Sequence, residues 1–273
     1  MRIVPSVVVA GTGILGVGHI SIETLGHIKA ADAVFYLVAD PVTEGFIQQN
    51  NPNSTSLQGC YREQAPRMEA YEAMVQTILA AMQQYDNVCA LFYGHPGMFV
   101  YPSHELISRA KALGFDARML PAISTEDCLF ADLAVDPSRD GCQSYEATDF
   151  LIHERLFSPH SPLVLWQVGV IGDPTYRSAG YGIRNLDILV QRLVEHHPPT
   201  HRVVLYEAPH FVICPPRADW IPLAELPKAQ VTAVTTLYVP ASSRSRANLD
   251  TARKLGLSSS SAMPDRAPDC VTC

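Results

Sequence analysis

Three features of common protein classes are missing from this sequence of 273 residues. No apolar run approaches the ~20 residues that a membrane-spanning helix needs, so we expect no membrane partner. Clustered basic side chains are also missing: 20 Lys and Arg stand against 27 Asp and Glu, a formal charge of −7, which argues against nucleic acid. The first residues lack the pattern of a secretion signal, and we therefore expect a cytoplasmic protein.

Metal-binding and disulfide patterns are sparse as well. The seven cysteines are odd in number and widely spread, so we expect reduced thiols. Cys270 and Cys273 have CxxC spacing, but one pair cannot complete a four-ligand zinc site. The ten histidines form no ligand set either, and we expect no metal ion. Ser124 has no G-x-S-x-G context, so a serine nucleophile has no support.

The composition does favour a large folded core, since 47% of residues are hydrophobic and 17% are charged. Apolar runs alternate with stretches of helical period, which is typical of parallel βα units. The expected strands span residues 7–10, 34–38, 88–93, 117–120, 162–168, 203–206 and 235–239. The expected helices span residues 22–28, 69–82, 103–113, 186–194 and 246–255, and a further helix begins after Ser124, where the sequence has capping-box character.

This pattern changes near residues 113–116. Strands and helices alternate regularly before that point, whereas afterwards the connections lengthen and prolines accumulate. We therefore expect an α/β fold of two lobes packed together, residues 1–113 and 114–241. From residue 242 the composition turns to Ser, Arg and Ala, which predicts a short helix and a flexible tail over 242–273.

A glycine-rich turn, Gly11–Gly16, follows the first strand and has the letters of G-x-G-x-x-G. Asp40, at the end of the second strand, stands where a ribose-binding acid is expected in a dinucleotide site. A tight strand-to-helix turn that merely needs glycine explains the same letters. On these residues we favour a nucleotide-type ligand over a plain turn, although not a dinucleotide in particular.

A denser motif, Tyr93–Gly97, stands at the carboxyl end of the most apolar strand. Ligands of open α/β sheets bind at that edge. Two glycines and a proline make a rigid turn there, and Tyr93 and His95 add hydrogen-bonding rings. We expect a binding turn.

Tyr61, Arg67 and Tyr71 form a third group. Arg67 and Tyr71 are four residues apart, so a helix starting near Pro66 places them on one face. A cation beside a phenol lowers the phenol's pKa, which would suit Tyr71 as general base for a very weak acid. On these residues alone, an ordinary amphipathic helix with an exposed Arg is the simpler interpretation.

The motifs occur in a characteristic order along the chain. That order resembles the tetrapyrrole (corrin/porphyrin) methylase superfamily, on the stretches Gly11–Gly13, Tyr93–Gly97, Leu120–Ser124 and Tyr206–Pro209. The chain is more closely similar to the borosin peptide backbone α-N-methyltransferases, on Ala39–Phe46, Glu126–Leu133 and Tyr145–Ile152. The similarity covers about residues 6–257.

The resemblance implies a tetrapyrrole-methylase-like (class III methyltransferase) fold, with S-adenosylmethionine in the cleft between two α/β lobes. Arg67, Tyr71 and Tyr93 match positions that the family uses for catalysis, and Tyr61 lines the same pocket. Met98 and Thr125 depart from the Val and Ala common in the family. The positions matching the cofactor site are Tyr93, His95, Met98, Tyr101, Ser124, Thr125, Gln167, Ala208, Thr235 and Thr236.

The implied activity is α-N-methylation of backbone amides in a ribosomal precursor peptide, with S-adenosylhomocysteine as product. Because the sequence ends soon after Leu257, we expect a separate precursor, bound by a homodimer as a heterotetramer with two precursors. A methyltransferase acting on a tetrapyrrole or another small molecule is the nearest alternative. An NAD-type oxidoreductase and a non-catalytic peptide-binding module are more distant ones.

Overall fold

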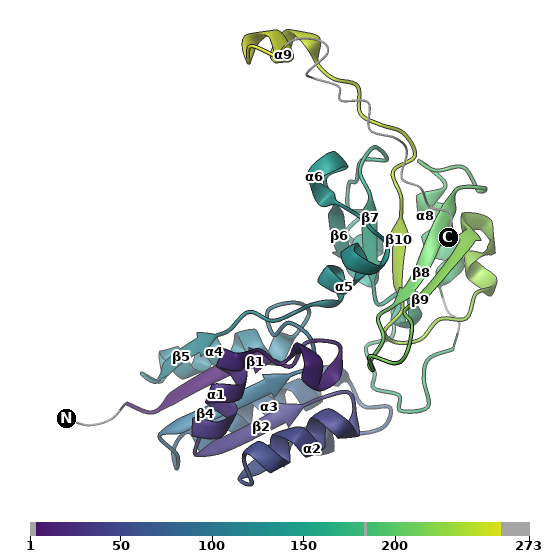
Figure 1. The fold of residues 1–273 in the computed structure, drawn as a ribbon. Coiled ribbons are helices and arrows are strands. Elements are labelled where there is room, and N and C mark those ends of the chain that lie inside the picture. The colour runs from purple at the N-terminus through teal and green to yellow at the C-terminus, as the bar shows by residue number, and fades with distance from the viewer. Residues whose placement is uncertain (1–3, 183–184, 258–273) are drawn as a thin grey trace.

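The computed structural model describes residues 4–182 and 185–257. Two five-stranded sheets lie in separate lobes, which Figure 1 shows one above the other. The first sheet is wholly parallel, in the order β3-β2-β4-β1-β5. Its strands are β1 (Ser6–Gly11), β2 (Ala33–Leu37), β3 (Ser54–Ser56), β4 (Asn87–Phe92) and β5 (Asp116–Met119).

Helices cover both faces of this first sheet. Helices α3 (Arg67–Ala81) and α4 (Tyr101–Ala112) pack on one face, where Met74 and Leu106 are fully buried. Helices α1 (Ile22–Ala30) and α2 (Pro41–Asn50) cover the other, where Ile28 and Ile47 are fully buried. Burial on both faces explains why β1 and β4 are nearly continuous apolar runs. The short helices η1 (Gly16–His19) and η2 (Gln58–Cys60) lie in the connections.

The second sheet has the order β6-β7-β10-β8-β9 and is mixed. Only β6 and β7 pair in parallel; β10 is antiparallel to β7 and β8, and β9 is antiparallel to β8. The expectation of parallel βα units was therefore wrong for most of this lobe, since antiparallel strands need no crossover helix. The strands are β6 (Gln143–Glu146), β7 (Leu163–Trp166), β8 (Arg202–Glu207), β9 (Arg217–Pro222) and β10 (Thr236–Val239).

Helices again lie on both faces of the second sheet. Leu129 of α5 packs on one face, against Val164 and Val204. The other face is covered by α7, α8 and η4. The helices of this lobe are α5 (Thr125–Asp132), α6 (Pro137–Asp140), α7 (Ala147–Ile152), η3 (Val168–Val170), α8 (Leu186–Leu193) and η4 (Leu223–Lys228).

The two lobes meet at a connection that begins after β5. Because β5 pairs with β1, the first sheet extends beyond residue 113 to Met119. The expected helix after Ser124 is confirmed as α5, with a capping box between Ser124 and Asp127. The α/β fold with two lobes is thus confirmed.

Beyond β10 the chain leaves the second lobe as an extended arm (Figure 1). The arm ends in helix α9 (Leu249–Lys254), which Asn248 caps and which is shorter than the expected helix over 246–255. Cys270, Cys273 and the expected flexible tail over 258–273 lie outside the described residues. In the part of the chain that the structure describes, no helix has the length and hydropathy that crossing a bilayer requires.

Candidate functional site

The turns after β1 and β4 interlock at the carboxyl edge of the first sheet. The amides of Gly13 and Gly94 donate to each other's carbonyl oxygens, at 3.3 and 3.0 Å. A Cβ atom on Gly11 would lie 2.0 Å from the Gly94 oxygen, so only glycine allows this approach. The glycines of both motifs therefore bring two backbone turns together.

The Gly11–Gly16 turn lacks the geometry of a dinucleotide site. The amides of Ile14 and Leu15 donate to Nδ1 of His19, at 3.3 and 3.1 Å, and not into an open phosphate cradle. Asp40 caps helix α2, accepting from the Thr43 amide at 2.8 Å and from its hydroxyl at 2.7 Å. The turn and the acid therefore have structural partners, which disfavours the dinucleotide interpretation.

An inner cavity lies between the lobes, with a volume of about 880 Å³ including the part open to solvent. The first lobe contributes the turn after β1 and the Tyr93–Gly97 turn with the residues that follow it. The second lobe contributes the start of α5 and the ends of β7, β8 and β10. The lining residues are Ile14, Tyr93, Gly94, His95, Met98, Phe99, Val100, Ser124, Thr125, Glu126, Trp166, Gln167, Ala208, His210, Ala233, Val234 and Thr236.

Most of the residues expected at a cofactor line this inner cavity. They are Tyr93, His95, Met98, Ser124, Thr125, Gln167, Ala208 and Thr236. Tyr101 lines a neighbouring cavity instead. Thr235 is fully buried and does not line the inner cavity.

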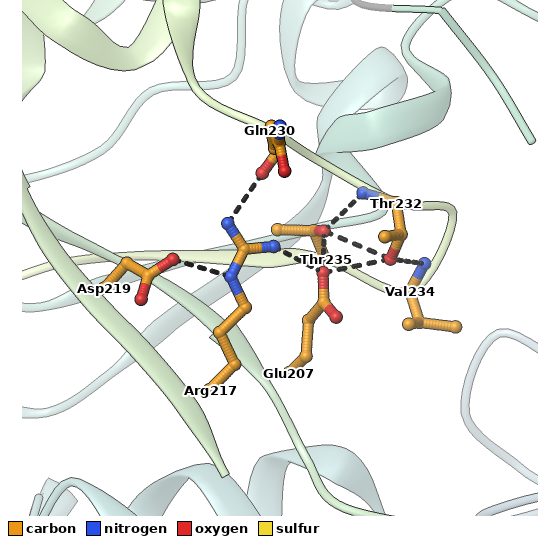
Figure 2. A network of polar contacts seen from close by, with 7 residues as sticks. All are labelled: Glu207, Arg217, Asp219, Gln230, Thr232, Val234 and Thr235. Carbon is orange, nitrogen blue, oxygen red and sulfur yellow. Dashed lines mark hydrogen bonds and ion pairs between the residues drawn. The ribbon is translucent and has the colours of Figure 1, made fainter.

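The buried hydroxyl of Thr235 belongs to a polar network that shapes one wall of the cavity (Figure 2). It donates to Glu207 and accepts from the Thr232 amide at 2.7 Å. Glu207 forms an ion pair with Arg217 at 2.9 Å, and Arg217 also donates to the Gln230 carbonyl at 2.7 Å. These bonds hold the loop whose residues 233, 234 and 236 face the cavity.

An outer cavity of about 890 Å³, open to solvent, adjoins the inner one. The two share Phe99, Val100 and Gln167 as lining residues. Arg67 and Tyr71 both line the outer cavity, on the face of α3 that their spacing predicts. Its lining comprises Arg67, Met68, Tyr71, Phe99, Val100, Tyr101, His104, Gln167 and Pro174.

Tyrosine rings surround the Tyr71 side chain. Tyr61 meets Tyr71 edge-on at 6.3 Å between centroids, and Tyr101 is stacked with it at 6.2 Å. Burial raises the pKa of Tyr61, and so do the charge and hydrogen bond of Tyr71, whereas the Arg67 cation lowers it. The Arg67 cation therefore acts on the Tyr61 phenol, but burial outweighs it and the pKa of Tyr61 is raised overall.

Tyr93 stands apart from that group, in the inner cavity. Its hydroxyl lies 3.5 Å from Nδ1 of His210, and burial raises its pKa, with smaller contributions from Cys128 and Asp40. The phenol therefore stays protonated near neutral pH and can donate a hydrogen bond.

Several lining residues had not been expected from the sequence, among them Phe99, Glu126, Trp166 and His210. Trp166 could have been identified, because it ends an apolar strand and the carboxyl ends of strands line such sites. Phe99 has a φ of 56°, which is rare for an aromatic residue and has no signal in the sequence. Burial raises the pKa of Glu126, so this cavity wall carries a carboxyl group that ionises less readily than usual.

The described residues contain no group of three or more His, Cys, Asp or Glu that could hold a metal ion. All five cysteines in the described part of the chain are free.

The two α/β lobes with a cavity between them have the class III methyltransferase fold, as likenesses to solved structures show. Uroporphyrin-III-C-methyltransferase from Thermus thermophilus matches with a TM-score of 0.61 at 17% identity, over 87% of this chain and 92% of its own. Cobalt precorrin-4 methyltransferase of cobalamin biosynthesis matches with a TM-score of 0.62 at 15% identity, over 86% and 94%. These likenesses confirm the expected fold.

The chain belongs to the tetrapyrrole (corrin/porphyrin) methylases, whose family model matches residues 6–209. Curated relatives include the methyltransferase and dendrothelin A precursor of Dendrothele bispora, 40% identical over 96% of this chain and 64% of the relative. The methyltransferase and omphalotin A precursor of Omphalotus olearius has the same identity and coverage. A type III borosin precursor of Anomoporia bombycina is 42% identical over 92% of this chain and 30% of the relative. The chain thus spans between about a third and just under two thirds of these relatives.

Proposed function

We propose that the protein is an S-adenosylmethionine-dependent methyltransferase that methylates backbone amide nitrogens of a ribosomally made peptide. The observation that carries this proposal is the pair of adjoining cavities, one between the lobes and one holding Arg67 and Tyr71. A methyl donor in the inner cavity and an acceptor in the outer one would meet where the two cavities share Phe99, Val100 and Gln167.

The chemistry of the inner cavity suits this donor. Of the described residues that line it, none is Lys or Arg, so it offers no cationic side chain for the phosphates of a dinucleotide. Ile14, Met98 and Val234 supply apolar surface for a nucleoside, while Ser124 and Gln167 supply polar groups. When bound, the donor supplies an activated methyl group on a sulfonium.

The acceptor presents a harder problem, because an amide nitrogen shares its lone pair with the carbonyl and is a poor nucleophile. We infer that Tyr71 removes the amide proton, assisted by the Arg67 cation, which favours the phenolate. Tyr93 stays protonated and supplies a donor on the inner side, where negative charge on the carbonyl oxygen would need stabilisation. Tyr61 packs edge-on against the base and limits its motion.

The peptide substrate is supported by the relatives, whose names join a methyltransferase to a cyclic peptide precursor. In those relatives both parts belong to one polypeptide. A separate precursor, bound as a heterotetramer of two enzyme chains and two precursors, is our prediction for this chain.

A homodimer is also proposed. The arm that carries α9 extends away from both lobes (Figure 1). Leu249, Leu255 and Leu257 are exposed along it. Apolar side chains on such an arm favour packing against another chain.

The proposal is tested by incubating the protein with isotope-labelled S-adenosylmethionine and with a precursor peptide that is added as a separate chain. Tandem mass spectrometry should locate each added methyl group on a backbone nitrogen. A methyl group on a side chain, or methylation of a tetrapyrrole but no peptide, would contradict the peptide assignment. Binding of NADH but not of S-adenosylmethionine would contradict the donor.

A further inference from the structure

A segment of the second lobe, Asp173–Ser178, crosses onto the first lobe beside Arg67; we call it the strap. Its backbone pairs with the chain that leads into α3. The Gln64 amide donates to the Tyr176 carbonyl at 2.8 Å, and the Tyr176 amide donates to the Ala65 carbonyl at 2.9 Å. This is an antiparallel pairing between residues more than 100 positions apart in the chain.

Side chains strengthen the same crossing. The amide and hydroxyl of Ser178 donate to the Glu63 carboxylate at 3.0 and 2.8 Å. The ring of Tyr176 stacks on Tyr61 at 4.4 Å, and its hydroxyl accepts from Gln58 at 3.1 Å. The strap thus contacts Gln58, Tyr61 and Glu63, which precede α3 in the chain.

The strap is braced internally by the Asp173 carboxylate. One oxygen accepts from the amide and the hydroxyl of Thr175, at 2.9 and 2.6 Å, and the other accepts from Arg177 at 2.9 Å. These bonds lower the pKa of Asp173 to about 2, so the carboxylate stays ionised at neutral pH. Tyr181 adds a brace, since its hydroxyl donates to the Thr175 carbonyl at 2.7 Å.

Arg67 is the residue on which the strap acts. Its amide donates to the Pro174 carbonyl at 2.9 Å, and its guanidinium donates to the Asp173 carbonyl at 2.6 Å. A guanidinium has five N–H donors, so one bond to the strap fixes its direction and leaves others for the outer cavity. Pro174 itself lines that cavity.

We propose that Asp173 and Thr175 are positioning residues, which fix the direction of the Arg67 guanidinium in the cavity that it lines together with Tyr71, by holding the strap in shape. This inference rests on the proposed function, because Arg67 has a catalytic role only if methyl transfer occurs at Tyr71. The first lobe would then carry the catalytic side chains, while the second lobe aligns them.

Two disruptive variants and one conservative variant test this role. Asp173→Ala and Thr175→Val remove the brace, whereas Thr175→Ser keeps the hydroxyl. The first two should lower kcat for peptide methylation by about tenfold, because small displacements of an oriented group cost rate. The dissociation constant of S-adenosylmethionine should stay within about twofold, because neither residue lines the inner cavity. Thr175→Ser should have the kcat of the parent protein, because it keeps the hydroxyl. Glu225→Gln, which removes an exposed ion pair with Lys228, is the matched control.

Amide hydrogen exchange provides a readout that needs no activity. The Gln64 and Arg67 amides should lose protection in Asp173→Ala and Thr175→Val, and keep it in Thr175→Ser and Glu225→Gln. Unchanged protection would overturn the inference, as would lost protection with unchanged kcat. If the unaltered protein methylates no peptide, the proposed function fails, while the exchange rates still decide whether the strap holds Arg67.

Discussion

The proposed chemistry depends most on the side-chain oxygen of Tyr71. Its ring lies between Tyr61 and Tyr101, which fix the ring whether or not it carries a hydroxyl. A variant that removes the oxygen alone therefore leaves the packing of the outer cavity in place.

Replacing Tyr71 by Phe should lower peptide methylation by at least about 100-fold, since a general base contributes roughly that factor or more. Calorimetry should find donor affinity within about twofold of the parent, because Tyr71 lines only the outer cavity. Tyr85→Phe, at a partly buried tyrosine that packs against the core of the first lobe, is the control. Equal turnover in both variants would refute Tyr71 as the base.

A buried histidine predicts how stability depends on pH. His197 is 3% exposed, stacks on Phe157, and its Nδ1 has no hydrogen-bond partner among the described residues. Burial, with the charges of His201 and His196, lowers its pKa from 6.5 to about 4. The unfolded chain therefore binds the proton first as pH falls, and stability is lost between about pH 6.5 and 4.

This loss should reach up to about 3 kcal/mol in the free energy of unfolding. His197→Phe keeps the stacking and should flatten the dependence, as measured by urea unfolding at pH 7 and pH 4.5. The exposed His160→Asn should behave as the parent protein does. A His197→Phe profile as steep as the parent's would show that other groups cause the loss.

At the scale of single residues, the sequence was informative where neighbours in the chain decide the geometry. The spacing of Arg67 and Tyr71 predicted their common face, because helical periodicity is local. The bond from Arg67 to Asp173 was invisible, since the two residues are 106 positions apart. Thr235 matched a cofactor position by resemblance, yet its hydroxyl is turned to Glu207.

Among the elements, the loop before β10 controls one wall of the inner cavity. Gly169 of η3 approaches it closely: a Cβ there would lie 2.0 Å from the Thr232 carbonyl oxygen. Because Thr232 is hydrogen-bonded to Thr235 and Glu207, the loop cannot move away without breaking these hydrogen bonds.

Gly169→Ala should therefore lower donor affinity by about tenfold or more and also destabilise the protein, since overpacking costs roughly 1–3 kcal/mol. Gly26→Ala, in α1 where a Cβ meets open space, should stabilise it by about 0.5–1 kcal/mol. Calorimetric titration and thermal unfolding of both variants make the comparison. Unchanged donor affinity in Gly169→Ala would contradict the role given to the loop.

The elements that could be predicted are those with strong apolar patterns. Strands β1, β4, β7 and β8 are almost wholly buried, and their predicted bounds agree with the structure to within about two residues. Strands β6 and β9 were missed, because both lie at the edges of their sheet and are only partly buried. Edge strands lack the burial that produces a pattern.

For the whole molecule, we predict a homodimer in solution. Light scattering coupled to size-exclusion chromatography measures its mass. A chain ending after Ala241 should bind the donor with unchanged affinity, because the arm lines neither cavity. The same shortened chain should dimerise more weakly, since it lacks the apolar residues of the arm. A monomeric mass for the 273-residue chain would contradict the proposed assembly.

The division of the site into two cavities has a consequence for engineering. Met68, Tyr101 and His104 line the outer cavity and not the inner one. Under the proposed function, randomising Met68 and His104, while keeping Tyr101 because it stacks on Tyr71, would change the choice of acceptor and leave the residues around the methyl donor unaltered.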